Sequence, residues 1–163
     1  MRADLGPMWP TTSLVLLTTS LLACATKAPP TTVAAPQFYT SADSVMKTLP
    51  FSEAVQVGNL LFLSGQIGVL PGTATLAPGG IGPESRQALE NIRAALGRHG
   101  ASLEDVVKCT IFLADISEWG AFNSVYREFF SAPYPARSAL GSSGLAFKAR
   151  AEVECIAVVP PTP

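Results

Sequence analysis

Arg137 stands out among the charged residues because nothing near it in the sequence can neutralise it. Pro133 and Pro135 precede it and small or apolar residues follow, a pattern typical of the start of a strand, since proline fixes φ and cannot donate to a sheet ladder. The next acidic residue is Glu152, beyond a glycine-containing turn. A planar guanidinium binds a carboxylate through two parallel hydrogen bonds. Arg137 is therefore either a surface charge or a group that binds an anionic ligand.

Other chemistries find little support in the sequence. The single histidine, His99, lies at a predicted helix end, where a cation interacts favourably with the last carbonyl groups. One histidine in that place argues against a Ser-His-Asp triad or a multi-histidine metal site. There is no zinc-type cysteine spacing, phosphate-binding glycine motif or basic run, and the net charge is −1. We expect neither a metal nor a nucleic acid as a partner.

Residues 1–23 are predicted to be a signal peptide. Arg2 precedes an apolar stretch over 14–23, which is too short to span a bilayer as a mature helix. The stretch ends in Leu-Leu-Ala-Cys, which resembles a bacterial lipoprotein signal, in which Cys24 is lipidated. Cleavage at Ala25, at the ordinary secretory site Ala23-Cys24-Ala25, is the alternative. We expect an exported protein of the bacterial cell envelope, anchored to the membrane through Cys24 and facing the periplasm, or soluble if it is cleaved at Ala25.

The remainder divides into a tether and one domain. Small residues, threonine and proline are frequent after Cys24, so residues 24–49 are predicted to form a low-complexity tether. Residues 50–163 are predicted to form the domain. Hydrophobic residues make up 48% of the chain and charged residues 14%, which is enough apolar material for a core.

Cys109 and Cys155 both lie in apolar, strand-like runs. The favoured interpretation is two small buried hydrophobic residues. A disulfide is the alternative in an exported protein, but the sequence does not establish that the two Cα atoms lie within bonding range.

The hydrophobic pattern of the domain predicts the order ββαβαββ. Gly58 and Asn59 form a turn dipeptide between two β-like runs, and Ser117 is expected to cap the second helix. The predicted elements are a hairpin over 51–69, a helix over 83–100, a buried strand over 105–116, a helix over 118–130, and strands over 136–141 and 148–159. This order implies an α+β domain whose mixed sheet carries both helices on one face. The other face would be bare, which favours oligomerisation.

Both helices carry an apolar stripe that is expected to pack on the sheet. In the first helix, the residues at helical spacing are Ala88, Leu89, Ile92, Ala95 and Leu96. In the second, they are the aromatic residues Trp119, Phe122, Tyr126 and Phe129.

Six segments together resemble the Rid/YjgF family of enamine/imine deaminases. They are PFSEAVQVGNLLFLSGQIG, QALENIRAAL, SLEDVVKCTIFLADI, FNSVYREFF, PARSAL and AEVECIAVV, in the order and spacing of that family. The resemblance implies a YjgF/chorismate-mutase-like homotrimer with three clefts between subunits. RidA-like members hydrolyse 2-imino or enamine acids, such as 2-iminopropanoate, to 2-keto acids and ammonia without a metal or organic cofactor.

The resemblance also implies roles for individual residues. Arg137, in the P-A-R-S motif, would hold the substrate carboxylate. Glu152 would hold a water molecule and move its proton to the departing nitrogen. Ser64 and Gly65 match the family's S-G-Q motif, and Asn123 matches an asparagine of the second helix; all three are candidate substrate-binding residues, although Ser64 and Asn123 also have ordinary structural interpretations.

The chain departs from the family pattern at several places. Phe51 stands where many RidA-like members have tyrosine, and Ala139 where many have cysteine, although both positions remain candidate substrate contacts. Residues 141–149 lack the usual Leu-Pro-x-Asp turn. An exported protein would not meet the 2-aminoacrylate that cytoplasmic enzymes release. The alternative function is therefore a non-catalytic ligand-binding or interaction module of the cell envelope on the same trimeric fold.

Overall fold

The structure, a computed structural model, describes residues 35–161. The predicted signal peptide, the lipidation site at Cys24 and the first part of the tether lie outside the described residues. Within 35–161, neither helix has the length and apolarity needed to cross a membrane.

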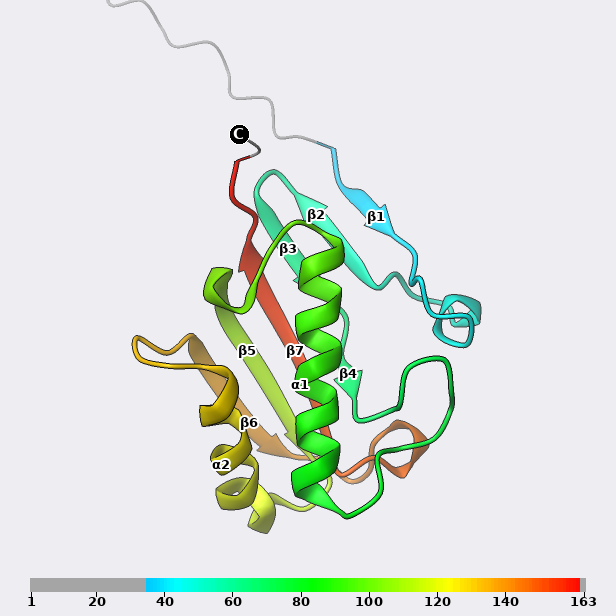
Figure 1. The fold of residues 1–163 in the computed structure, drawn as a ribbon, viewed down its shortest axis with the longest axis vertical. Coiled ribbons are helices and arrows are strands. Elements are labelled where there is room, and N and C mark those ends of the chain that lie inside the picture. Colours follow the sequence, from blue (N-terminus) through cyan, green and yellow to red (C-terminus); the bar gives the residue numbers. More distant parts are fainter. Residues whose placement is uncertain (1–34, 162–163) are drawn as a thin grey trace, which may run out of the picture. The chain divides into compact units, whose positions relative to one another are not determined.

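One mixed sheet forms the centre of the fold (Figure 1). The strand order is β1-β2-β3-β7-β5-β6, with β4 pairing separately with β7. All neighbouring strands are antiparallel except β5 and β6, which are parallel. The strands are β1 (Gln37–Tyr39), β2 (Ala54–Val57), β3 (Leu60–Leu63), β4 (Gln66–Ile67), β5 (Val106–Leu113), β6 (Ala136–Gly141) and β7 (Ala151–Val158), and the helices are α1 (Ile81–Arg98) and α2 (Trp119–Phe129). The predicted α+β class and mixed sheet are confirmed.

Local sequence signals explain most of these elements. Gly58 has a φ of 61° in the turn between β2 and β3, a conformation that glycine adopts at little steric cost. The predicted cap of α2 is wrong. The N-cap of α2 is Glu118, which makes no side-chain cap hydrogen bond, and Asp115 caps the short 3-10 turn before α2, where its carboxylate accepts a hydrogen bond from the Ser117 N–H at 2.9 Å.

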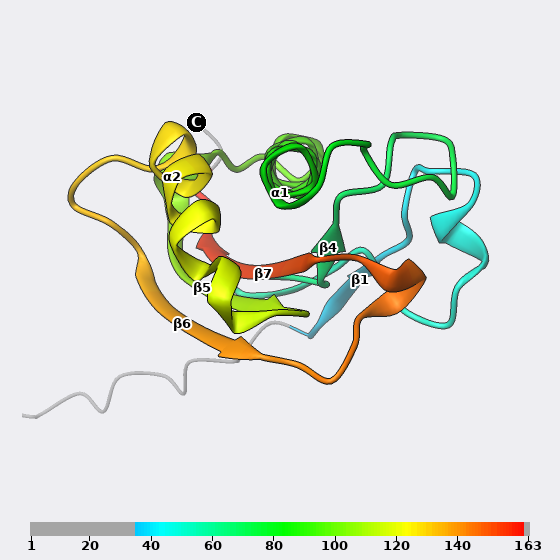
Figure 2. The same ribbon diagram turned by 90° about the horizontal axis from the view of Figure 1, so that it is seen from below.

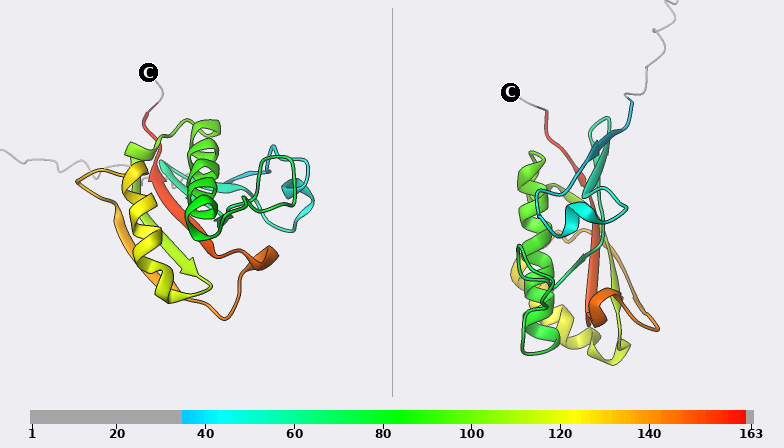
Figure 3. Two further views of the ribbon diagram at one scale, coloured as in Figure 1. Left: turned by 60° about the horizontal axis from the view of Figure 1, so that its bottom comes forward. Right: turned by 90° about the vertical axis from the view of Figure 1, so that its right-hand side faces the viewer.

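Both helices pack on the same face of the sheet (Figure 2; Figure 3, right). All five predicted apolar residues of α1 are inaccessible to solvent, and they pack against sheet residues such as Leu61, Ile111 and Val153. In α2, Phe122 and Tyr126 are buried, as predicted. Trp119 is not, since 47% of its surface is exposed.

The opposite face of the sheet is uncovered and partly apolar. Phe62, Leu60 and Leu140 are each about two-fifths exposed, and the strand registers place their side chains on the side away from the helices, because Leu61, Ile111 and Val153 alternate with them toward the core. Exposed apolar residues on one face of a sheet are a feature of interaction surfaces. The predicted bare face is present.

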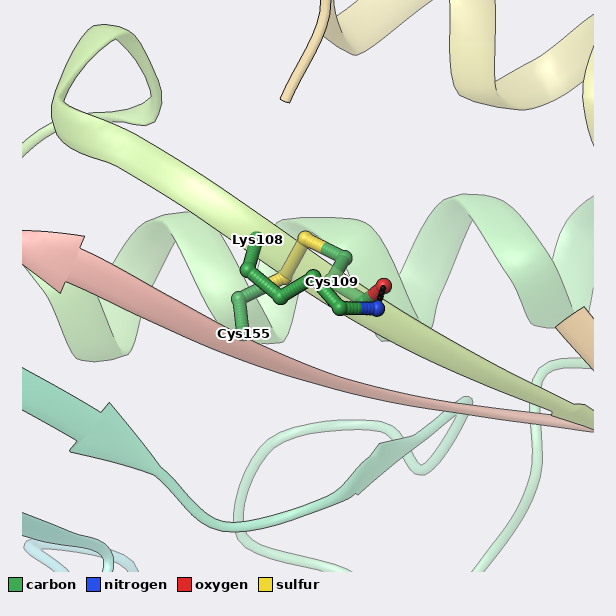
Figure 4. Close-up of a disulfide and its surroundings, with 3 residues drawn as sticks. All are labelled: Lys108, Cys109 and Cys155. Atoms are coloured by element: carbon green, nitrogen blue, oxygen red, sulfur yellow. Dashed lines mark hydrogen bonds between the residues drawn. A yellow bond between two sulfur atoms is a disulfide. The ribbon is translucent and has the colours of Figure 1, made fainter. Parts of the chain in front are cut away.

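A disulfide joins Cys109 of β5 to Cys155 of β7 (Figure 4). The interpretation as two unpaired buried cysteines is therefore wrong, although both residues are indeed buried. The two residues are directly opposite each other in the antiparallel register, with their Cα atoms 4.1 Å apart. Directly opposite residues on adjacent strands bring their side chains to the same face, so the sheet itself places the two sulfur atoms together.

The chain joins the sheet before Pro50, where the domain was predicted to begin. Residues of β1 pair with β2, and Tyr39 donates a hydrogen bond to Gln56 Oε1 at 2.8 Å. Tyr39 also packs against His99, with the ring centroids 4.3 Å apart. The part of the predicted tether from residue 37 onward therefore contributes to the folded unit.

His99 lies at the C-terminal end of α1, as predicted, and there it takes part in a buried ionic cluster. Its Nε2 lies 3.0 Å from Oε2 of Glu53, which is only 5% exposed and which also binds the guanidinium of Arg98. Burial raises the pKa of Glu53, but the hydrogen bonds and charge of Arg98, with hydrogen bonds from His99 and Ser41, outweigh it and hold that pKa below its usual value. The only histidine of the chain thus has a structural partner.

Candidate active site

Arg137 lies on β6, at the edge of the sheet, facing α2. It is paired in register with Cys109, whose side chain points toward the helices, so Arg137 points to the same side. Its guanidinium carbon lies 4.8 Å from the ring centroid of Tyr126 and 5.8 Å from that of Trp119. Cation–π contacts at these distances hold the planar group against aromatic faces. No carboxylate among residues 35–161 lies within ion-pair distance of Arg137.

A hollow of about 270 Å³ lies beside this guanidinium. Its wall includes Arg137, Asn123 and the aromatic residues Trp119, Tyr126 and Tyr134. The predicted pair of Arg137 and Asn123 is therefore brought together. Burial raises the pKa of Tyr126 to about 12, although the charge of Arg137 opposes this, so the hydroxyl is neutral near pH 7.

Glu152 lies near the start of β7, with its carboxylate against Gly65. The neighbouring residues Ala151 and Val153 point to the core, so Glu152 points to the uncovered face. A methyl group on Gly65 would collide with Oε1 of Glu152. Burial, and after it the charge of Glu154, raises the pKa of Glu152. A carboxyl group of this kind, half-buried and with a raised pKa, is suited to proton transfer.

A β-bulge shapes the backbone around Gly65. Phe62 pairs with Ile156 and Gln66 pairs with Val153, so the three residues 63–65 stand opposite the two residues 154–155. An extra residue of this kind breaks the ladder and redirects the backbone. Ser64, within the bulge, donates a hydrogen bond from Oγ to the carbonyl of Ser52 at 2.7 Å. This bond fits the structural interpretation of Ser64 and places it beside the segment that carries Phe51, which is half-exposed.

Replacing Gly65 by alanine is expected to abolish most of any reaction that depends on Glu152 while leaving the domain folded. The three atoms nearest to the added methyl group all belong to the flexible side chain of Glu152, which can move aside but then loses its position. Activity and the unfolding midpoint should be measured together. Gly97→Ala is the matched control, since a methyl group there meets no atom within 4 Å. Full activity of the Gly65 variant would contradict the placement of Glu152 at the reacting centre.

The structure does not bring the two groups of residues together within one chain. Arg137 and Asn123 lie on the helix side of the sheet, whereas Glu152 lies on the uncovered side, in register with Phe112. The hollow beside Arg137 includes neither Glu152 nor Gly65. Ala139, the remaining predicted contact, follows Arg137 on the same face of β6 and packs against the core.

The loop before β7 contains two residues with an unusual backbone conformation. Phe147 and Lys148 have φ angles of 58° and 62°, in the left-handed region that side chains with a Cβ rarely adopt. At its end, Arg150 binds the carboxylate of Glu118 and donates its backbone N–H to Glu84 at 2.9 Å. These bonds fix the start of the strand that carries Glu152, so the altered loop still holds β7 in place.

The sequence did not predict the aromatic wall around Arg137. Trp119 and Tyr126 were expected to pack on the sheet, but they are seven residues apart and flank the guanidinium on one side of α2. Tyr134, between the two prolines before β6, adds a third ring. The sequence did contain a signal for this wall, because Trp119 and Tyr126 lie on one predicted helix shortly before Arg137, which has no nearby carboxylate. Within residues 35–161, no three His, Cys, Asp or Glu side chains are grouped to hold a metal ion.

The sequence of this chain matches one protein family. The family described as Endoribonuclease L-PSP matches residues 42–159. A 2-iminobutanoate/2-iminopropanoate deaminase of Dermatophagoides farinae is 44% identical over 110 residues, covering 68% of this chain and 86% of that protein. The goat protein of the same name is 42% identical over 112 residues, covering 69% and 82%.

Solved structures lead to the same family. YyfA of Yersinia pestis, described as a Rid-family protein of unknown function, has a TM-score of 0.72 and 33% identity, covering 77% of this chain and 100% of that one. RidA of a Psychrobacter species has a TM-score of 0.66 and 36% identity, covering 74% and 94%. The chain therefore belongs to the Rid/YjgF family, as the sequence motifs predicted.

Proposed function

We propose that this protein hydrolyses 2-imino acids, or the enamines from which they form, to 2-keto acids and ammonia. The observation that carries the proposal is Arg137, an arginine with no carboxylate partner among the described residues, held against two aromatic rings at the edge of a hollow. The names of the relatives from mite and goat support the same reaction. A guanidinium in this setting is ready to bind the carboxylate that every 2-imino acid carries.

The chemistry needs only a positioned carboxylate and water. Arg137 binds the substrate carboxylate and thereby places the imine carbon. Glu152 takes a proton from water, whose oxygen bonds to that carbon, and returns the proton to the nitrogen. The resulting tetrahedral carbinolamine passes the proton of its hydroxyl to the nitrogen through Glu152 as the C–N bond breaks, which releases ammonia and leaves the carbonyl of the 2-keto acid. General acid–base catalysis of this kind contributes about 10²–10⁴-fold.

The two groups of residues are proposed to meet across subunits of a homotrimer. Arg137 and Glu152 lie on opposite faces of the sheet, so a second copy is needed to complete one cleft. The uncovered apolar face, with Phe62 and Leu140, offers a surface for that contact. Each cleft would combine Arg137 of one subunit with Glu152 of the next.

An exported location fits the disulfide. Disulfides persist in oxidising compartments such as the bacterial periplasm and are rare in the cytosol. The pair of Cys109 and Cys155 therefore supports the proposal that the protein acts outside the cytoplasm, anchored through Cys24. There the imines would come from extracytoplasmic oxidation of amino acids.

The family description mentions RNA cleavage, which this chain is poorly suited to perform. Its net charge is −1, and Glu152 and Glu154 lie together on the uncovered face. Nucleic-acid binding depends on basic side chains that neutralise phosphates. A non-catalytic ligand-binding module remains the alternative, and it shares the hollow and Arg137 with the enzyme.

Replacing Arg137 by alanine is expected to lower kcat/KM for imine hydrolysis by about 10–150-fold, the equivalent of losing a charged hydrogen bond of about 1.5–3 kcal/mol. An amino-acid oxidase would generate the imines, and decay of the imine would be followed against keto-acid formation. Arg137→Lys should retain only part of the activity, since lysine keeps the charge without the fork of donors. No acceleration by the unaltered protein would favour the binding module.

Mixing two inactive variants tests the shared cleft. Arg137→Ala and Glu152→Gln subunits, co-expressed with different tags and isolated as mixed trimers, should regain about a third of the normal activity, because one of the three clefts in every mixed trimer receives both intact residues. Trimers of either variant alone provide the baseline. Mixed trimers that stay at that baseline would rule out a cleft shared between subunits.

A further inference from the structure

The hollow beside Arg137 offers more aromatic surface than a small substrate can contact. Trp119 and Tyr134 are each about half-exposed and flank it, and the buried ring of Tyr126 forms a further part of the wall. The methyl side chain of 2-iminopropanoate would leave these rings in water. The guanidinium that is proposed to hold the carboxylate lies in the same hollow, so a substrate bound there would direct its side chain along aromatic surfaces.

Two residues that line the hollow carry a buried polar atom that is not paired. Oδ1 of Asn123 and the hydroxyl of Tyr126 are shut off from solvent and have no hydrogen-bond partner among residues 35–161. Both residues line the hollow and are less than a tenth exposed. Unpartnered buried polar atoms are rare in folded proteins and often mark a functional site. Packing alone would favour apolar residues at both positions.

We infer that this hollow receives the substrate's side chain and selects 2-imino acids with an aromatic side chain, of the kind formed when phenylalanine or tyrosine is oxidised. The inference rests on the proposed imine hydrolysis. A planar ring buries a large area and pairs well with other aromatic faces. The hollow, at about 270 Å³, suits a ligand the size of one amino acid.

The first experiment compares kcat/KM for imines made from alanine, leucine, phenylalanine and tyrosine. We expect the phenylalanine imine to be preferred over the alanine imine by about 10–100-fold, as for other discriminations based on apolar contact. Trp119→Ala should reduce this ratio about tenfold, and Trp119→Phe should retain most of it. An equal loss for all substrates in Trp119→Ala would overturn the inference, since it would mean that the ring only positions Arg137.

Binding of the product acids separates the inference from the proposed reaction. Phenylpyruvate should bind more tightly than pyruvate in calorimetric titrations, and the difference should shrink in Trp119→Ala. Hydrolysis with a preference for the alanine imine would refute the aromatic specificity and leave the deaminase intact. If no imine is hydrolysed, the deaminase is refuted, and tighter binding of phenylpyruvate would still support an aromatic 2-oxo acid site. Equal binding of the two acids would refute that site as well.

Discussion

Replacing Glu152 by glutamine is expected to lower kcat for imine hydrolysis by about 10²–10⁴-fold with little change in KM. Glutamine keeps the size of the side chain, and the close contact with Gly65 remains possible, but the amide cannot accept the proton of water. The substrate carboxylate is bound by Arg137, so affinity should persist. Rates should be measured under saturating imine. A variant that keeps its full kcat would exclude Glu152 as the proton-transfer group.

The neighbouring carboxylate supplies a matched control with a pH signature. Glu154 is exposed, and its charge contributes to raising the pKa of Glu152 above the usual 4.5. Activity requires the ionised form of Glu152, so it should fall as the pH drops through that raised pKa. Glu154→Gln removes one cause of the shift, and the acid limb of the pH–rate profile should move to lower pH while the maximum rate is retained. A limb that stays in place would show that burial alone sets the pKa.

Removing the disulfide is expected to reduce the free energy of unfolding by about 2–4 kcal/mol. Cys109 and Cys155 are separated by 46 residues, and a loop of this size gives the unfolded chain considerable entropy once the link is lost. The double variant Cys109→Ala/Cys155→Ala removes only the sulfur atoms from a buried position. Urea unfolding should be followed by fluorescence, and we expect the double variant to unfold at a lower urea concentration than the unaltered protein.

Reductant provides the control for this measurement. The unaltered protein, once unfolded and reduced, should refold with a stability close to that of the double variant, whereas the double variant should not respond to reductant. Mass spectrometry after alkylation of the unfolded protein counts the free thiols. Two free thiols in protein taken from an oxidising compartment would show that the disulfide does not form there.

The elements that depend on residues close together in the sequence were predictable. Five apolar residues at helical spacing defined the buried side of α1, and the Gly58-Asn59 pair located the turn between β2 and β3. Segment β1 was missed because its three residues follow a tract of threonine, alanine and proline that resembles a linker. It is stable because it pairs with β2 and contacts His99, and both partners are distant in the sequence.

The candidate site residues could be named from their motifs, but their arrangement could not. Arg137 and Glu152 were recognised from their motifs. Their placement on opposite faces depends on the registers of β6 and β7 against β5, and a shift of one residue would reverse a face. The same dependence on register left the pairing of Cys109 and Cys155 open. Burial of Glu53 beside the only histidine likewise required a tertiary contact between segments 46 residues apart.

The order of the strands has a mechanical consequence. β1 and β6 form opposite edges of the sheet, so the chain enters the domain at the edge farthest from Arg137. A pull on the amino-terminal side would first peel the three residue pairs between β1 and β2, and the contact of Tyr39 with His99. The strands that carry Arg137 and Glu152 are separated from that edge by β2 and β3, and the disulfide links β7, which carries Glu152, to its neighbour β5. Tension on the amino-terminal segment would thus separate β1 from β2 before it reached the candidate residues Arg137 and Glu152.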